Sequence, residues 1–352
     1  MTTTTTKLDS LAAPRLPAGW LLLLALLATL PAWPAPIGTE FHLELGVQVL
    51  SMVIFALSLQ LLVGYTGLVS LGHAAYFGIA AYAVTLLAPA SEAGNGWWLL
   101  VVAVGSAALL ALLVGMLVIR TRGVYFIMVT LAFAQLAYFV VHDVDGFGGS
   151  DGAYLYFKPE FRLGERLLFD LQQPRQLYWF ALGLFALTAS LLGLVLRSRA
   201  GHALVGIRHN EQRMRAAGYP TALYKLGSFV LSGGLAGLAG FLHAVRSGFV
   251  NPELLSWHQS GNALLMIILG GLGNLWGAVL GAASFVLLSE WFQAMSKHWQ
   301  LLLGGFIIGT VLLLPRGLVG LADMLRPWLR GRLRPRRGKP TVLGFQHKER
   351  TS

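Results

Sequence analysis

The chain has 352 residues, of which 56% are hydrophobic and only 12% are charged, and its formal net charge is +11. Because a soluble domain usually carries about 25% charged residues, this composition excludes an ordinary soluble protein. The chain contains no cysteine, which excludes disulfides, thiolate metal sites and a catalytic thiol. Runs such as WLLLLALLATL are apolar on every side instead of alternating, so helices are favoured over the strands of a membrane barrel. The expected fold is all-α, a polytopic helical membrane protein.

Ten apolar stretches follow one another along the chain, most of them long enough to cross a hydrocarbon layer about 30 Å thick. They cover 18–35, 46–64, 73–89, 97–119, 124–141, 177–196, 223–245, 260–272, 275–290 and 299–315. The eighth is short and rich in glycine, which predicts a re-entrant or broken helix, so the expected number of transmembrane helices is eight to ten. The first resembles a signal peptide, but the many spans after it favour an uncleaved helix.

Basic residues predict the orientation, since Lys and Arg remain on the cytoplasmic side of short loops. With both termini in the cytoplasm, the cytoplasmic segments hold 20 of the 26 Lys and Arg residues. The sequence therefore predicts a cytoplasmic tail at 1–17, a transmembrane domain at 18–322, an external loop at 142–176 and a basic cytoplasmic tail at 323–352. The positive charge is thus explained by topology and by contact with membrane lipids, and no nucleic-acid partner is expected.

The cytoplasmic segment 197–222 is long for a connection between packed helices. Within it, Asn210 is a candidate N-cap, Glu211 lies in the first turn, and Gly218 is a candidate C-terminal stop before Pro220. The pattern predicts a short helix outside the membrane. Two interpretations remain open from these residues: the helix docks into a groove on another protein, or it lies on the lipid headgroups.

The stretch GYTGLVSLGHAAYFGIAAY, residues 64–82, interrupts the apolar pattern with glycines and hydroxyl groups. Transporters use broken helices at membrane depth because unwound backbone supplies hydrogen bonds to a polar solute. The alternative is plain packing of helices through small residues. The expected substrate-pathway residues here are Gly64, Thr66, Gly67, Ser70, Gly72 and His73.

The fifth span carries Tyr125, Met128, Ala132, Gln135 and Tyr138 on one helical face. An amide facing hydrocarbon is costly, so Gln135 should face other helices or a wet cavity. Pathway lining by Tyr125 and Gln135, and hydrogen bonding between helices, are the two expectations.

Two glycine series are typical of helix-packing seams. The first is Gly233, Gly237 and Gly240, and the second is Gly273, Gly277 and Gly281.

Motifs for enzymatic chemistry are missing from the sequence. There is no G-x-x-x-x-G-K-[ST] phosphate loop, no HExxH and no paired metal-ligand cluster, so no cofactor, metal or catalytic residue is expected. Any ATP hydrolysis that drives uphill transport must then occur in another chain. No Asp or Glu lies in the middle of a predicted span, which argues against a proton-coupled carrier.

Several stretches together resemble the membrane permease subunits of branched-chain amino acid ABC importers of the LivM type. They are residues 64–82, RGVYFIMVTLAFAQ, GGSDG, LLSWHQSGNALLMIILGGLGNLWGAVLGA and LPRGLVGL, and the resemblance extends over about 46–322. It implies a type II importer permease in the inner membrane. Its implied partners are a sister permease subunit, two cytoplasmic ABC ATPases and a periplasmic or lipid-anchored binding protein that delivers branched-chain or related amino acids.

The same resemblance implies that GIRHNEQRMRAAGYP, within 197–222, is the segment that couples the permease to its ATPase. The expected coupling residues are Arg208, Asn210, Glu211, Arg213, Arg215, Ala216, Ala217 and Gly218. Their spacing departs from the EAA-x-x-x-G pattern of importers, so individual contacts do not carry over directly. Two other functions remain as alternatives: an ATP-independent channel or ion-coupled carrier for small solutes such as urea or amides, and a membrane scaffold without its own pathway.

Overall fold

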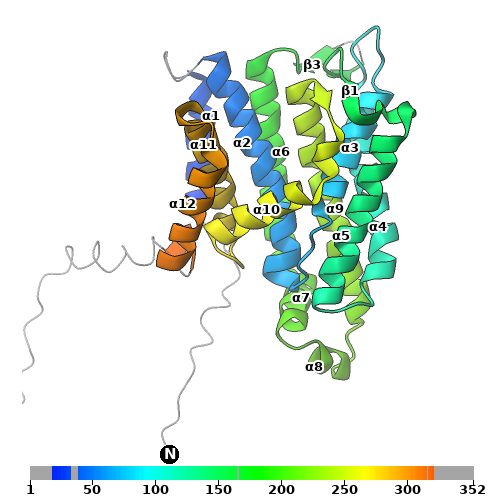
Figure 1. Cartoon of the computed structure of the whole chain (residues 1–352), viewed down its shortest axis with the longest axis vertical. Helices are drawn as coiled ribbons and strands as arrows, with labels where there is room; N and C mark the ends of the chain where they lie inside the picture. The colour runs from blue at the N-terminus through cyan, green and yellow to red at the C-terminus, as the bar shows by residue number, and fades with distance from the viewer. Residues whose placement is uncertain (1–17, 33–38, 165, 315, 321–352) are drawn as a thin grey trace, which may run out of the picture.

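The computed structural model describes residues 18–32, 39–164, 166–314 and 316–320. The predicted tails at 1–17 and 323–352 lie outside the described residues. The chain folds as a bundle of helices (Figure 1). The α-helices are α1 (Ala18–Thr29), α2 (Glu40–Gln60), α3 (His73–Leu87), α4 (Gly96–Val118), α5 (Val124–Asp143), α6 (Pro174–Arg197), α7 (Arg199–His209), α8 (Glu211–Ala216), α9 (Thr221–Ser247), α10 (Trp257–Gly270), α11 (Leu275–Met295) and α12 (Trp299–Leu313).

Six helices in the described part of the chain are long and apolar enough to cross a membrane. They are α2 with its extension to Thr66, α4, α5, α6, α9 and α11, while α3 and α12 are shorter apolar helices. The polytopic helical fold is therefore confirmed. The short eighth stretch is α10, whose 14 residues run obliquely across the bundle in Figure 1 and end before Gly271, where φ is 119°. At about 1.5 Å per residue it is only about 21 Å long, too short to span the membrane.

The core is built around α2 and α9, whose most apolar windows are each 83% buried. Glycines allow α9 to approach its neighbours closely. A Cβ at Gly237 would lie 2.8 Å from the Cβ of Ala107 on α4, and one at Gly240 would collide with the carbonyl oxygen of Phe77 on α3. The first predicted seam is confirmed, because a side chain at these positions forces the helices apart.

The second predicted seam is confirmed only in part. Gly277 and Gly281 on α11 pack against the backbone of α10. The prediction is wrong for Gly273, because this residue lies in the loop between the two helices, with φ of 81°. A left-handed backbone, which glycine adopts without a steric cost, is the reason for a glycine there.

The predicted break between the second and third spans is confirmed. The last turns of α2 continue as a π-helix, η3 (Leu61–Thr66), which ends at Gly67 in the left-handed region with φ of 78°. The next residues, up to Gly72, are not helical, and α3 starts only at His73. In Figure 1 this segment rises from the lower end of the bundle, so that α3 begins near mid-height.

The predicted external loop at 142–176 contains short strands that the all-α expectation did not foresee. Two 3₁₀ turns, η4 (Asp145–Phe147) and η5 (Gly149–Asp151), precede β1 (Ala153–Tyr154), and β2 (Glu160–Leu163) pairs antiparallel with β3 (Arg166–Asp170). Strand β1 pairs with β4 (Phe249–Val250), which follows α9 and precedes the 3₁₀ turn η6 (Pro252–Leu255). These strands lie at the end of the bundle opposite α7 and α8 (Figure 1).

The segment 197–222 contains two helices where the sequence predicted one. Helix α8 is the predicted helix, and α7 before it was missed. Ser198 is the N-cap of α7, and its side chain accepts a hydrogen bond from the amide of Gly201. Gly201 and Gly206 weaken the helical pattern in the sequence, yet Gly206 has a packing role, since a Cβ there would lie 2.8 Å from the sulfur of Met214.

Candidate functional site

Helix α8 has the ends that its sequence predicts. The Asn210 side chain accepts a hydrogen bond from the amide of Arg213 at 2.9 Å, which is the expected N-cap. Gly218 follows the helix with φ of 83° and has nothing within 4 Å of its would-be Cβ. The local prediction for 210–218 is confirmed, because it depends on capping rules that act within one turn.

Glu211 is the centre of an ion cluster. Its carboxylate lies 2.7 Å from the Lys225 ammonium and 2.6 Å from the Arg215 guanidinium, with the Thr221 hydroxyl at 3.2 Å and Arg122 at 3.9 Å. The cluster joins α8 to the first two turns of α9 and to the α4–α5 connection. The carboxylate is thus engaged within the chain, and its side chain is only 15% exposed.

The cluster also sets the protonation of Glu211. Partial burial raises the pKa of this carboxyl, but the hydrogen bonds and charges of Lys225 and Arg215 outweigh burial and hold the pKa below its usual value. The carboxylate is therefore ionised at neutral pH.

The remaining predicted coupling residues form an exposed surface at the end of the bundle that carries α7 and α8 (Figure 1). The exposed members are Arg208, Asn210, Arg213, Arg215, Ala216, Ala217 and Gly218. This surface is basic and ends in small residues, so another protein can approach its backbone closely.

Arg208 connects this surface to the broken segment. Its guanidinium donates a hydrogen bond to the carbonyl oxygen of Gly64 within the π-helix. A Cβ at Gly67 would lie 3.0 Å from the Arg208 Cγ. The sequence placed Arg208 in the coupling set and the two glycines in the pathway set, and the structure brings the two sets together.

A further residue at this junction, Gln60, was missed. Its amide nitrogen donates to the carbonyl oxygens of Asn274 at 3.1 Å and Gly271 at 3.4 Å, and its side chain is fully buried. Gln60 thereby ties the end of α2 to the loop between α10 and α11. The sequence contains a signal for this role, because Gln60 is an amide inside the apolar run ALSLQLLVG. Burying that amide is as costly as burying the amide of Gln135.

Other predicted pathway residues are packed inside the bundle. Thr66 donates to the carbonyl oxygen of Leu61 at 3.0 Å, and the Ser70 hydroxyl accepts from the amide of Gly72 at 3.2 Å. The His73 ring lies 2.7 Å from the Ser58 hydroxyl and stacks on Phe55.

All three of Thr66, Ser70 and His73 are buried, and Gly72 packs against the backbone of Thr130 on α5. None of these four residues lines either of the cavities described below. The residues of the break are therefore packed inside the bundle, where they determine the conformation of the segment between α2 and α3.

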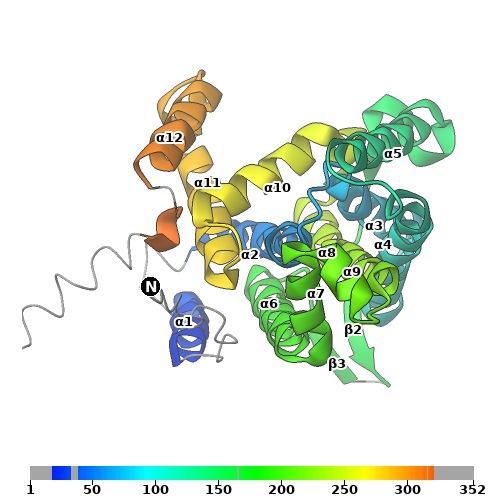
Figure 2. The ribbon, with the colours of Figure 1, turned by 90° about the horizontal axis from the view of Figure 1, so that it is seen from below.

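A cavity of about 940 Å³ lies between α5, η6, α10, α11 and α12. In Figure 2, α12, α11, α10 and α5 follow one another around a concave side of the bundle. Gln135 lines this cavity, which matches one of the two expectations for it, whereas Tyr125 on the same helix is 75% exposed and does not line it. The amide nitrogen of Gln135 is buried and has no hydrogen-bond partner among the described residues.

The cavity lining is unusually polar for a chain of this composition. Its polar residues include Gln135, Glu253, His258, Gln259, Asn262 and Ser289, and its aromatic residues are Tyr138, Trp257, Phe285 and Trp299. Most of the polar residues lie between 251 and 262, a polar run at the start of the short eighth stretch. Sequence reasoning did not assign them to the pathway, although the run WHQSGN marks the place.

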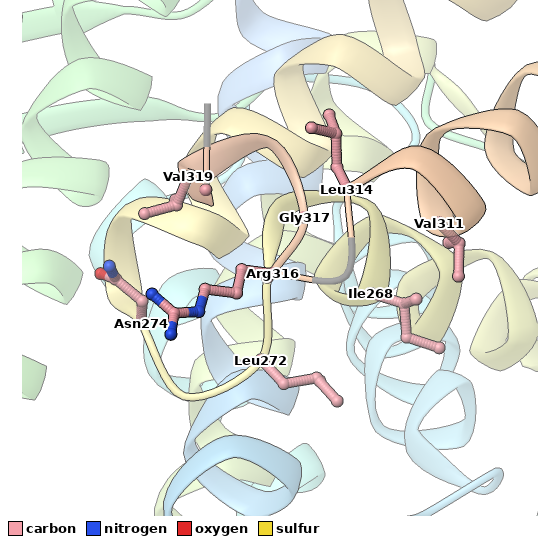
Figure 3. Close-up of a pocket in the computed structure, with 10 residues that line it drawn as sticks. Ile268, Leu272, Asn274, Val311, Leu314, Arg316, Gly317 and Val319 are labelled. Carbon is pink, nitrogen blue, oxygen red and sulfur yellow. The ribbon is translucent and has the colours of Figure 1, made fainter. Parts of the chain in front are cut away.

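A second cavity, of about 370 Å³, lies where the loop after α10 meets the end of the chain described by the structure. Figure 3 shows the Arg316 side chain extending toward Asn274, with Ile268, Leu272 and Val311 on the other side. The two loops meet through glycine, since a Cβ at Gly317 would lie 2.6 Å from the amide nitrogen of Gly271. This cavity holds no residue of the predicted pathway.

Comparison with known proteins identifies the family. A family model described as "Branched-chain amino acid transport system / permease component" matches residues 42–314. The high-affinity branched-chain amino acid transport system permease protein LivM of Escherichia coli (strain K12) is 31% identical over 330 residues, covering 88% of this chain and 76% of that protein. LivM of Salmonella typhimurium is 30% identical over the same shares.

A shorter match is the autoinducer 2 import system permease protein LsrC of Salmonella paratyphi B, 33% identical over 110 residues, which is 30% of this chain and 31% of that protein. No solved structure matches the chain. The family model matches residues 42–314, and the alignment with LivM covers 88% of this chain. The chain therefore belongs to the permease components of branched-chain amino acid transport systems, as a multi-pass membrane subunit that works with other components.

Proposed function

We propose that the chain forms one half of the translocation path of an ATP-driven importer, and that a sister permease subunit covers its concave side. The observation that carries this proposal is the polar cavity between α5, α10, α11 and α12. Within a membrane, polar side chains on an uncovered face would meet hydrocarbon at a cost of several kcal/mol each. A second subunit enclosing water on this side removes that cost and creates a path.

The surface of α7 and α8 is the proposed docking site for a cytoplasmic ABC ATPase, with one such subunit for each permease. Its exposed arginines and its free backbone at Gly218 support this role. The excess of Lys and Arg on this side supports a cytoplasmic location for it and for both termini. ATP hydrolysis takes place in the partner, and this chain transmits the movement.

The proposed solutes are branched-chain amino acids, delivered by a periplasmic or lipid-anchored binding protein. The support is the similarity to LivM of two bacteria over most of both chains. The cavity also suits such solutes, because apolar and aromatic side chains alternate in it with amide groups.

Reconstitution tests this function. The chain, its sister permease and its ATPase are placed in proteoliposomes with the binding protein, and uptake of radiolabelled leucine is measured with and without ATP. Uptake that requires ATP, the ATPase and the binding protein is the expected result. Uptake of urea or acetamide by the chain without ATP would instead favour the channel alternative.

Cysteine cross-linking tests the covered side separately. The chain has no native cysteine, so Gln300→Cys in the cavity lining and Leu113→Cys on the exposed side of α4 can be compared. A short bifunctional thiol reagent should join Gln300→Cys to cysteines on the sister permease and leave Leu113→Cys unjoined. The reverse pattern would place the partner on the wrong side of the bundle.

A further inference from the structure

The described lining of the large cavity contains an acidic side chain but no Lys or Arg. Among the described residues that line it, Glu253 is the only acidic one, and no Lys or Arg is present. Glu253 is exposed and belongs to η6, where the chain enters the cavity before α10. No ion pair in the described part of the chain involves its carboxylate. Among the described residues of the lining, the Glu253 carboxylate is therefore the one acidic group, and it has no ion-pair partner there.

Aromatic rings accompany this carboxylate. Trp257 follows it by four residues and is 45% exposed, and the His258 ring lies next to the Trp257 ring at a centroid distance of 3.9 Å with an angle of 31° between the two planes. Trp299 and Tyr138 line the same cavity from α12 and α5. The faces of such rings attract cations, and the attraction adds to that of a carboxylate when both are present.

We propose that Glu253, with these rings, binds the ammonium group of the transported solute and so selects solutes that carry a protonated amine. This inference rests on the proposed function, because it assumes that the cavity is part of the path. A solute that is purely anionic meets repulsion from Glu253, and no Lys or Arg among the described lining residues compensates for it. A neutral solute such as urea gains nothing from the charge. An amino acid places its ammonium at Glu253 and its carboxylate toward the amides of Gln259 and Asn262.

The position of Glu253 in the chain agrees with a role in solute entry. Glu253 lies three residues after Val250 of β4, the strand that pairs with the outer loop. It is therefore near the outer entrance of the cavity, where a solute released by a binding protein arrives first. A carboxylate at an entrance concentrates cationic groups and raises their rate of entry.

The test uses Ser256→Cys, a single cysteine in the cavity lining of the assembled importer. Its modification by two methanethiosulfonate reagents, one carrying trimethylammonium and one carrying sulfonate, is followed on this chain after gel separation. Rates are normalised to those of a free thiol in solution. Because Ser256 is three residues from Glu253 in the lining of the same cavity, the Glu253 charge should favour the cation by roughly tenfold.

Three variants on this background make the test specific. Glu253→Gln should abolish the preference for the cation, and Glu253→Asp should keep most of it. Glu92→Gln, which removes an exposed carboxylate outside the cavity lining, should leave the preference unchanged.

Two outcomes would overturn the inference, and they are distinguishable. Equal rates for both reagents in the unmodified Glu253 background would show a wet cavity without charge selection, which removes the ammonium site and leaves the proposed path intact. No reaction with either reagent would show that the cavity is closed to water, which removes both.

Discussion

Replacing Glu211 by Gln should destabilise the cytoplasmic end of the bundle, because it leaves Lys225 without its main partner. The Lys225 side chain is only 7% exposed and its ammonium lies 2.7 Å from the Glu211 carboxylate. Removing one member of a buried ion pair costs about 3–5 kcal/mol, since the other charge stays desolvated and unpaired. Glu211 is 15% exposed, which allows some water to compensate, so we expect a loss of about 2–4 kcal/mol.

The assay is a double-mutant cycle of thermal unfolding in detergent. Glu211→Gln and Lys225→Met are measured singly and together, because the coupling between the two sites isolates the pair from other effects. The single Glu211→Gln change should lower Tm by roughly 4–8 °C. The double variant should be more stable than Glu211→Gln alone, since it no longer buries an unpaired ammonium. An unchanged Tm for Glu211→Gln, or fully additive effects, would refute the role assigned to this pair.

The same cluster predicts the pH dependence of this end of the molecule. The pKa of Glu211 is held below its usual value by Lys225 and Arg215. A depressed carboxyl pKa contributes stability that is present above the unfolded-state value and is lost as the pH falls through the folded-state value. ATPase copurification with the permease should therefore be constant between pH 6 and pH 8. A loss within that range would contradict the assignment.

Three further changes test the packing of the path. Gly72→Val should abolish uptake, because its Cβ would collide with the Thr130 carbonyl oxygen. The control, Gly105→Val, has nothing within 4 Å of its Cβ and should preserve uptake in the same assay. Gly240→Val should reduce the yield of folded protein by separating α9 from α3, at a cost of about 1–3 kcal/mol or more, as gel filtration would show. Gln60→Leu should keep the ATPase bound but lower ATP-driven uptake, since it frees the loop after α10; normal uptake would contradict that link.

Much of the fold could be predicted from the sequence, because the membrane imposes simple rules. The length of the apolar stretches predicted the main helices, and the spacing of glycines predicted the packing seam at Gly233, Gly237 and Gly240. The capping signals at Asn210 and Gly218 act within one turn, so they were also reliable. Helix α7 was missed because Gly201 and Gly206 lower helix propensity, and only its tertiary packing shows why they are tolerated.

The site was less predictable, because its contacts join distant parts of the chain. The hydrogen bond from Arg208 to Gly64 links residues 144 positions apart, which no local pattern reports. Gln135 was expected to face either other helices or a wet cavity, because an amide in an apolar helix has a definite cost, and it lines the large cavity. His73 shares that cost and yet lies in the subunit core, where Ser58 satisfies one ring nitrogen. The cost of burial predicts that a buried polar group needs a hydrogen-bond partner, but it does not predict which group that partner is.

The pairing of β1 with β4 has a mechanical consequence for how the path responds to the outside. The pairs Ala153–Val250 and Tyr154–Phe249 fasten the outer loop to the chain immediately before η6. A Cβ at Gly152 would collide with the Val250 carbonyl oxygen, so the two backbones are in direct contact. In the proposed importer, a binding protein that contacts this loop would displace η6 and the adjoining wall of the cavity through the few residues between β4 and η6. Docking of the loaded binding protein would then be coupled directly to the shape of the cavity, without a signal passing through the bundle.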